Sequence, residues 1–200
     1  MNTPSSISRV IDLHRLLIKF HDIERLIYLP DSKTNHDRWE TDTEHSYTLA
    51  MLAWYLAQNA THLDTNKCIQ YALVHDLVEI YAGDTFAYEK DQQKLDSKEA
   101  RELAARKKLQ QEWPDFDPMH QAIESYELQK DNESRFVYAL DKLQPIILNV
   151  LAEGKSWHTH KLSLETLKQQ KKGKIAVSPE VAALYEELIA ILETKPEYFG

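Results

Sequence analysis

Apolar residues recur at every third or fourth position along most of the chain, the spacing that places them on one face of an α-helix. The pattern predicts a helix from Asp96 to just before Trp113, and others over about 44–59, 64–82, 117–129 and 133–152. Only four glycines interrupt the chain, and it contains no internal repeat, linker or low-complexity segment. We therefore expect an all-α fold, a helical bundle that forms a single domain over residues 1–200.

The N-terminal segment is expected to form a helix that begins at Ser5 or Ser6, because serine is a favoured N-cap residue. Five apolar residues fall on one side of this helix: Ile7, Val10, Ile11, Leu17 and Phe20. Residues 28–43 are polar, contain a proline and show no regular period. We interpret them as a loop.

Local signals mark several helix ends. Gly83 is expected to stop the helix over 64–82. Asp96 and Glu99 have the spacing of a capping box, which predicts a helix start at Asp96. Towards the C-terminus, Ser178 is the expected N-cap of the last helix, and the basic residues at 168–174 are interpreted as a solvated helix end.

The dipeptide His-Asp occurs three times, at 21–22, 36–37 and 75–76, and the last of these stands out. Only His75 and Asp76 interrupt a helix whose neighbours are mostly apolar. Burying an imidazole and a carboxylate costs several kcal/mol unless they are paired or bind a metal. On an α-helix the two side chains would converge on one ion, and Glu79, one turn later, would reach water bound to that ion. The other interpretation is a core histidine hydrogen-bonded to a nearby acid.

Two further residues join this pair. His45 lies at the start of an apolar helix, and Asp141 lies within the apolar face of the helix over 133–152. Either could be structural, His45 as a boundary residue and Asp141 in a salt bridge with a basic neighbour such as Arg135. Together, however, His45, His75, Asp76 and Asp141 form a set of two imidazoles and two carboxylates. Such a set suits one divalent ion such as Mn, Co, Fe or Zn and leaves positions open for water and substrate.

Composition and charge narrow the remaining possibilities. The single cysteine, Cys68, excludes an internal disulfide and fits a reducing compartment. Charged residues interrupt every apolar segment before it could span a bilayer, and the N-terminus does not resemble a secretion signal, so we expect a cytoplasmic protein without membrane contact. The net charge of −8 argues against nucleic acid as a partner. A small anionic substrate is still possible in a pocket that holds a metal and an arginine.

Three motifs in order carry a resemblance to a known family. They are EHS at 44–46, HDLVEIYAGD at 75–84 and ALDKLQP at 139–145. This order resembles the HD-domain superfamily of metal-dependent phosphohydrolases, and especially its branch of small bacterial 5′-deoxynucleotidases. The resemblance covers about residues 10–155, with the helices of 156–200 beyond it. It implies a helical HD fold with one divalent metal held by His45, His75, Asp76 and Asp141.

The resemblance also implies roles for other residues. Glu79 would be the catalytic acid, and Asp84 would lie near the sugar of the substrate and contribute to catalysis and binding. The family branch holds the phosphate with an arginine next to a tryptophan; Arg38 precedes Trp39 here, and Arg25 is the other candidate. Members of this branch are commonly dimers, so we also expect a homodimer.

These observations predict hydrolysis of the phosphomonoester of (deoxy)nucleoside 5′-monophosphates by a metal-activated water. A nucleotide pyrophosphohydrolase or a phosphodiesterase on the same scaffold is the alternative enzyme. A non-catalytic binding protein that keeps the metal as a structural element is the alternative outside the enzymes. The residues do not identify the base, the sugar or the metal.

Overall fold

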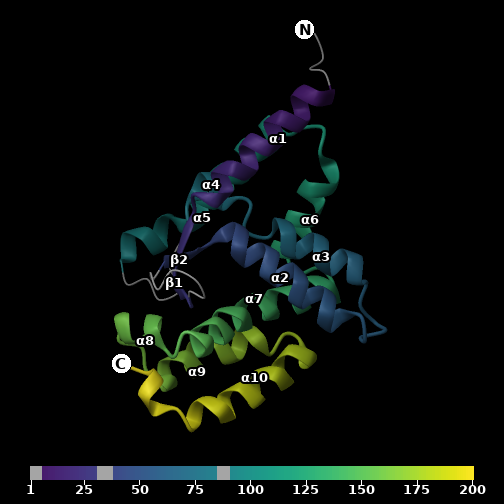
Figure 1. The fold of residues 1–200 in the computed structure, drawn as a ribbon. Helices are drawn as coiled ribbons and strands as arrows, with labels where there is room; N and C mark the ends of the chain where they lie inside the picture. Colours follow the sequence, from purple (N-terminus) through teal and green to yellow (C-terminus); the bar gives the residue numbers. More distant parts are fainter. Residues whose placement is uncertain (1–5, 31–37, 85–90) are drawn as a thin grey trace.

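The structure is a computed structural model that describes residues 6–30, 38–84 and 91–200, including all their side chains except those of residues 94 and 95. The His-Asp pair at 36–37 lies outside the described residues. Helices dominate the fold, as expected, and a small two-stranded sheet accompanies them (Figure 1). Within the described ranges, no helix combines the length and apolar character needed to cross a membrane.

The described elements follow one another in the order α1 (Ser6–His21), β1 (Glu24–Leu29), β2 (Arg38–Thr41), α2 (Asp42–Ala57), α3 (Thr65–Val74), α4 (Glu79–Ala82), α5 (Gln92–Glu112), α6 (Asp117–Glu127), α7 (Asn132–Leu151), α8 (Lys155–Thr159), α9 (Leu164–Ile175), α10 (Pro179–Glu193) and a 3₁₀ turn (Pro196–Tyr198). The predicted helices over 44–59, 117–129 and 133–152 are confirmed, with ends that shift by one or two residues.

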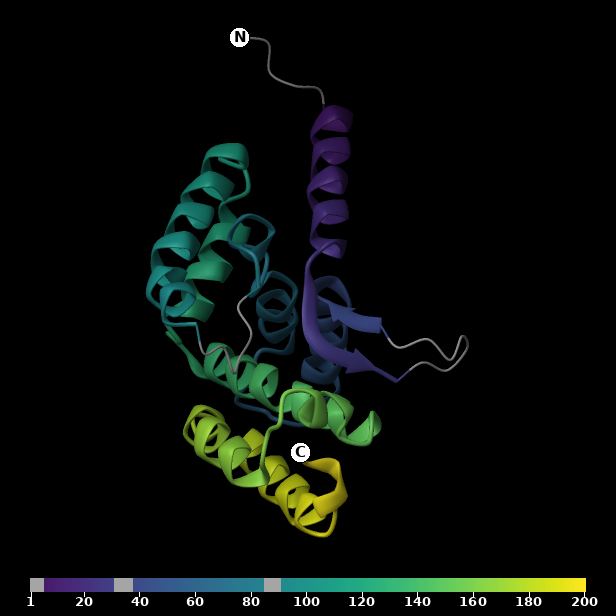
Figure 2. The same ribbon diagram turned by 90° about the vertical axis from the view of Figure 1, so that its left-hand side faces the viewer.

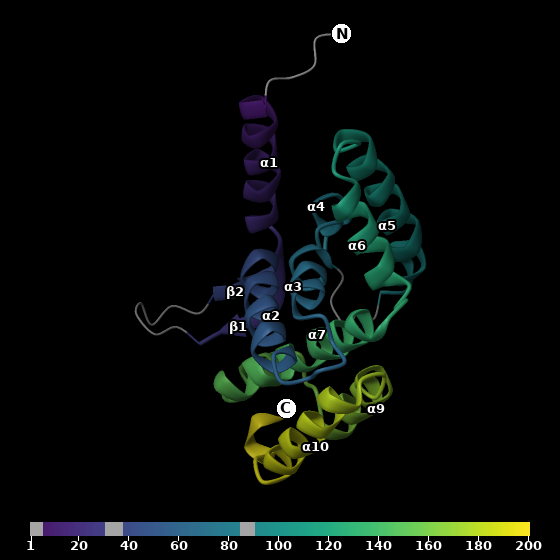
Figure 3. The same cartoon turned by 90° about the vertical axis from the view of Figure 1, so that its right-hand side faces the viewer.

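Helix α7 is the centre of the arrangement. It packs against α2, α3 and α6 on one side and against α9 and α10 on the other, as all three ribbon views show (Figures 1–3). Its side chains Phe136, Leu140 and Leu143 are almost fully buried in the main hydrophobic core. A smaller core lies between α1, α4, α5 and α6 around Phe20 and Leu109. Any side chain on the inner faces of α7 is therefore held in a fixed environment.

The described ends of the segment predicted as a loop over 28–43 contain strand structure instead, and its residues 31–37 lie outside the described residues. β1 and β2 pair antiparallel, with Tyr28 opposite Trp39, and these two rings stack with centroids 4.1 Å apart. The inward residue of β2 is Glu40, which is 1% exposed and accepts a hydrogen bond from Nε2 of Gln144 on α7 at 3.0 Å. The prediction was wrong because a four-residue strand that buries a glutamate shows no alternation of apolar and polar residues.

The helix predicted over 64–82 is broken. α3 ends at Val74, residues 75–78 form a turn, and α4 resumes at Glu79. The N–H groups of Leu77 and Glu79 donate to the carbonyls of Val74 and Asp76, three residues back. Gly83, with φ of 73°, then ends α4 as predicted. The apolar period continues through the break, and for this reason the sequence pattern does not reveal it.

One other expectation, the start of the helix at Asp96, was wrong, and most of the apolar residues named on the first helix are exposed. α5 begins at Gln92, and Asp96 lies inside it, accepting a hydrogen bond from the Gln92 side chain rather than capping the helix. On α1, only Phe20 of the five predicted apolar residues is buried, and the other four are at least 40% exposed: Ile7, Val10, Ile11 and Leu17. Figures 2 and 3 show the reason, since the N-terminal part of α1 extends beyond α2.

The start of α7 yields a prediction about stability. Asp131 caps the helix by accepting from the N–H of Ser134 at 2.7 Å, and it also binds Tyr71 and Lys67. Replacing it in Asp131→Ala should lower the free energy of unfolding by about 1–2 kcal/mol. Burial opposes ionisation of Asp131, but Lys67 and the cap hydrogen bonds outweigh it and lower its pKa to about 2. The ionised cap therefore stabilises the fold above the unfolded-state pKa, and the difference between variant and wild type should narrow as the pH falls towards 2.

Chemical denaturation at several pH values measures both effects. Asp12→Ala is the control, because Asp12 lies on the surface of α1 and bonds only its neighbour Arg15 among the described residues. It should change stability by less than about 0.5 kcal/mol. Equal losses in the two variants would contradict the prediction.

Candidate metal centre

Four predicted ligands converge on one point in the interior. His45 lies in the first turn of α2, His75 and Asp76 in the turn after α3, and Asp141 in the middle of α7. One ligand atom from each lies within 4.8 Å of the others. The Nε2 atom of His45 is 3.0 Å from Oδ1 of Asp141, and that of His75 is 2.9 Å from Oδ2 of Asp76. The structure thus brings together all four residues that the sequence singled out.

Local structure orients both imidazoles. Thr41 and Glu44 form a capping box at the start of α2, which fixes the first turn and with it His45. The Nδ1 atom of His75 is 2.9 Å from the carbonyl of Ala72, to which its N–H donates. That hydrogen bond leaves Nε2 as the lone-pair nitrogen, directed at the two carboxylates.

The donor set fits a divalent cation. His45 and Asp141 are at most 2% exposed, and His75 is 4% exposed. The Nε2 atom of His75 makes no hydrogen bond to any described residue, although it lies 2.9 Å from Oδ2 of Asp76, because a lone-pair nitrogen has no proton to donate to a carboxylate. A buried nitrogen of this kind, beside a second imidazole and two carboxylates, is what a metal would satisfy.

The charges agree with this interpretation. Burial alone would raise the pKa of Asp141, but Lys142, at 2.5 Å, together with the imidazoles, holds it well below its usual value. The pKa of Asp76 is also lowered, by His75 and Arg25 against the effect of burial. Burial and Arg25 oppose protonation of His45, yet its bond to Asp141 raises the pKa of that imidazole to about 9. A proton on His45 thus offsets negative charge of the nearby carboxylates, as a bound cation would.

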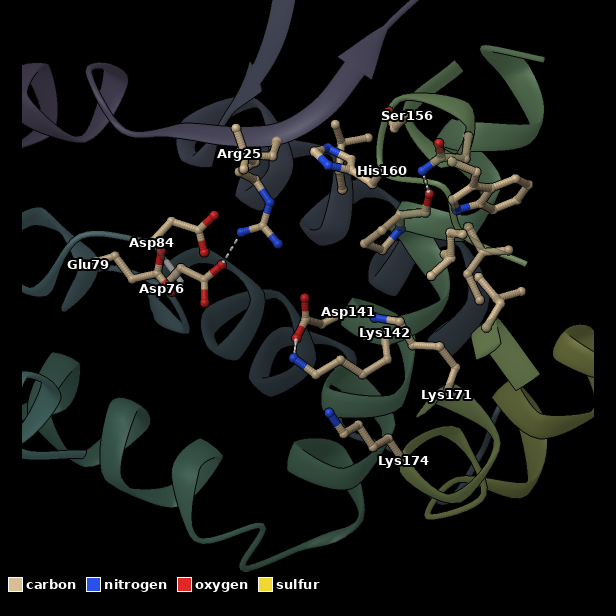
Figure 4. A pocket seen from close by; sticks show the side chains of 18 of the residues that line it. Arg25, Asp76, Glu79, Asp84, Asp141, Lys142, Ser156, His160, Lys171 and Lys174 are labelled. Atoms are coloured by element: carbon tan, nitrogen blue, oxygen red, sulfur yellow. Dashed lines mark hydrogen bonds and ion pairs between the residues drawn. The ribbon is translucent and has the colours of Figure 1, made fainter. Parts of the chain in front are cut away.

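A cavity of about 270 Å³ opens next to these ligands (Figure 4). Asp76 and Asp141 line it, together with Glu79 and Asp84 on the same side. The opposite parts of the wall come from α7, α8 and α9. The cavity is large enough for a small molecule that touches a metal ion in this centre.

Glu79 and Asp84, for which the resemblance implied roles in catalysis, both line this cavity. Glu79 is the first residue of α4, and burial followed by the charges of Asp76, Asp84 and Asp42 raises its pKa well above the usual value. Asp84, just after Gly83, also has a raised pKa, caused mainly by burial and opposed by Arg25. A carboxyl group whose pKa is raised towards neutral pH is suited to general acid and base chemistry.

The two candidate arginines differ in their placement. Arg25 lies on β1 and lines the cavity; one of its terminal nitrogens is 2.7 Å from Asp76 and 2.9 Å from Asp42. Arg38 instead donates two hydrogen bonds to Glu44, its side chain is 56% exposed, and it is not among the described residues that line the cavity. The structure therefore brings Arg25 to the centre and leaves Arg38 on the surface.

Four lysines at the cavity were not among the predicted site residues: Lys98, Lys142, Lys171 and Lys174. The interpretation of 168–174 as a solvated helix end was wrong for Lys171, which is 5% exposed. A signal did exist, since Leu167, Lys171 and Lys174 are spaced as one stripe on a helix. Another missed feature is the buried acidic pair Glu40 and Asp42 beside Arg25.

Similarity to a known protein family agrees with this geometry. The sequence profile of the HD domain matches residues 31–182, which include all four metal-ligand candidates. The chain belongs to the HD-domain family. Its all-helical fold and its His/Asp cluster agree with that membership, and HD domains bind divalent metals.

Several relatives share parts of this HD domain. The chain is 32% identical over 115 residues to a Bos taurus protein named 5′-deoxynucleotidase HDDC2, and 30% identical over 115 residues to its Homo sapiens counterpart. These matches cover 56% of this chain and 54% of each relative, so the chain spans about half the length of the curated relatives it matches.

Solved structures resemble the HD domain over more of its length. A Magnetospirillum magnetotacticum protein, titled a predicted metal-dependent phosphohydrolase, superposes with a TM-score of 0.79 at 28% identity over 98% of both chains. A conserved Pyrococcus furiosus protein superposes with a TM-score of 0.62 at 24% identity over 89% of this chain and 98% of its own, and it supports the fold alone.

The raised pKa of His45 predicts how metal binding depends on pH. At neutral pH the imidazole holds a proton that an ion must displace, so binding should release about one proton per Mn²⁺. The affinity should rise about tenfold per pH unit until the pH reaches about 9, and fall at lower pH. Titration calorimetry in two buffers with different ionisation enthalpies measures the proton release.

The matched variants are His45→Ala, which should lose binding, and His62→Ala, which should keep it. His62 is a surface histidine, 2.9 Å from Glu180 and outside the cluster. An affinity that did not change with pH would contradict the prediction.

Proposed function

We propose that this protein is a metal-dependent phosphohydrolase that cleaves the phosphomonoester bond of (deoxy)nucleoside 5′-monophosphates. The observation that carries the proposal is the opening of the candidate metal centre into a cavity that Glu79 and Arg25 also line. A metal, an acid and a cation around one small cavity are the groups that phosphate-ester hydrolysis needs. The name 5′-deoxynucleotidase of the Bos taurus and Homo sapiens relatives supports this class of substrate, and the name of the Magnetospirillum protein supports a metal-dependent phosphohydrolase.

The four ligands His45, His75, Asp76 and Asp141 would hold the ion. When bound, the ion would lower the pKa of a water and offset the negative charge of the phosphate. Glu79, at the cavity wall, takes the proton of the attacking water and returns one to the leaving oxygen.

Two more side chains orient the substrate in this proposal. Arg25 lies against Asp76 and faces the cavity, so its guanidinium can donate to the non-bridging oxygens of the phosphate. Asp84 lies on the same side of the cavity as Glu79 and is placed to accept a hydrogen bond from a sugar hydroxyl. Both assignments predict effects on substrate binding as well as on turnover.

The test is phosphate release by the Mn²⁺- or Co²⁺-loaded protein from a panel of ribo- and deoxyribonucleoside 5′-monophosphates, with di-, tri- and cyclic nucleotides alongside. Glu79→Gln should lower kcat by about 100-fold or more while the metal content stays unchanged. Asp76→Ala should lose both metal and activity. Glu187→Gln on the exposed side of α10 is the control and should behave as wild type.

The pattern of turnover decides the outcome. Release from monophosphates that disappears in Glu79→Gln supports the proposal. Turnover confined to longer or cyclic nucleotides would show that the proposed substrate class is wrong, while the assignment of the metal centre would still hold. No turnover on any nucleotide would favour a protein that uses the metal as a structural element.

We also propose that the protein forms a homodimer through α2. The outward side of this helix exposes a stripe of large apolar residues: Tyr47, Met51 four residues later, and the adjacent pair Trp54 and Tyr55 one further turn along. Each is at least 45% exposed. A continuous apolar patch of this kind is typical of an interaction surface, and the dimers of the resembled branch support this choice of partner.

Light scattering coupled to size-exclusion chromatography tests the dimer. Trp54→Glu should convert the dimer to a monomer, because a carboxylate would have to be buried at the interface. Leu128→Glu is the control, since Leu128 is 60% exposed at the end of α6, away from the stripe. A wild-type protein that elutes as a monomer at micromolar concentration would refute this part of the proposal.

A further inference from the structure

The inner side of α9 contributes a stripe of residues to the cavity. Leu167, Lys171 and Lys174 follow one another at helical spacing, and all three line the wall. Leu167 is fully buried and Lys171 is 5% exposed, while Lys174 is exposed at the mouth. A lysine is rarely buried to this extent, because its ammonium group is strongly hydrated in water.

The other lysines of α9 show that this placement is specific. Lys168 binds Glu193 at 2.6 Å and Lys172 lies 3.7 Å from Glu186, both on the outer side of the helix. For Lys174, in contrast, no carboxylate of a described residue lies within ion-pair distance. The outer lysines have acidic partners from α10, whereas Lys174 projects towards the cavity.

The inner lysines gather near two further lysines of the lining, Lys142 and Lys98. Burial, and then the charge of Lys142, lower the pKa of Lys171 to about 7 and also lower that of Lys174. These like charges repel one another, and an anion between them would remove the repulsion. The wall is therefore complementary to negative charge.

Next to the candidate metal centre, the two basic side chains already have carboxylate partners. Arg25 contacts Asp42 and Asp76, and Lys142 contacts Asp141. A phosphate bound to the ion would meet Arg25 and Lys142 first. In the view of Figure 4, Lys171 and Lys174 lie on the side of Lys142 away from Asp76 and Glu79. They are placed to meet a different part of the substrate.

We propose that Lys171 and Lys174 form a second anionic subsite, which binds a phosphate group other than the one that is hydrolysed. The substrate would then be a nucleoside with phosphates at two positions, one at the metal centre and one at α9. Lysine binds phosphate as a point charge, and a phosphate dianion between Lys171 and Lys174 would favour the ammonium form of both side chains. The cavity of about 270 Å³ suits a single small molecule of this kind. This inference rests on the proposed function for the identity of the reacting end.

Binding to the full-length, Mn²⁺-loaded Glu79→Gln protein tests the subsite without turnover. Calorimetry compares deoxyadenosine 5′-monophosphate with deoxyadenosine 3′,5′-bisphosphate. The bisphosphate should bind about tenfold more tightly, the effect of one to two charge-assisted hydrogen bonds. Adding Lys171→Met and Lys174→Met together should abolish that preference and leave the affinity for the monophosphate nearly unchanged.

Lys172→Met is the matched control, because it makes the same change on the outer side of α9 and should preserve the preference. If the double variant does not fold, Lys174→Met alone tests the subsite, because Lys174 is exposed and its replacement should not affect folding. It should reduce the preference for the bisphosphate about threefold.

An equal loss for both ligands would overturn the inference, because the lysines would then bind the reacting phosphate. The absence of any preference in the parent protein would overturn it as well. Phosphate release by the protein with Glu79 intact is measured separately, so a failure of the proposed function and a failure of the subsite give different results.

Discussion

The structure depends on keeping four ionisable ligands in its interior. His45, His75, Asp76 and Asp141 come from three separate segments and meet where α2, α7 and the turn after α3 approach one another. Uncompensated, each buried charge would cost several kcal/mol, comparable with the whole stability of a domain. The contacts of Arg25 and Lys142 with these carboxylates offset part of that cost, and a divalent ion would offset more.

The same constraint explains irregular features of the fold. The break between α3 and α4 places His75 and Asp76 on a turn, where both side chains can approach the point reached by Asp141. The β1–β2 hairpin brings Arg25 against Asp76 and closes one side of the cavity. Each of these features departs from regular helix and positions a charged side chain.

The C-terminal helices take part in the site as well as in the packing. α9 and α10 lie against α7 on the side away from α2 and α3 (Figure 1). Through Lys171 and Lys174, α9 adds positive charge to a cavity that is acidic at its metal end. At the candidate metal centre the carboxylates are paired with Arg25 and Lys142, whereas the lysines of α9 lie on the side of Lys142 away from Asp76 and Glu79.

The sequence alone determined the helical class, the main helices and the four candidate ligands. It could do so because helical spacing is a local property, and because a charged residue within an apolar face, such as Asp76 or Asp141, is a local anomaly. Only the tertiary structure decided that residues 24–41 include a hairpin, that Arg25 rather than Arg38 faces the cavity, and that Lys171 is buried. The physical reason is that burial of these residues depends on contacts with α7 and its neighbours, which lie far from them in the sequence. A lysine near a helix end is equally compatible with water and with a cavity wall until the packing of that helix is known.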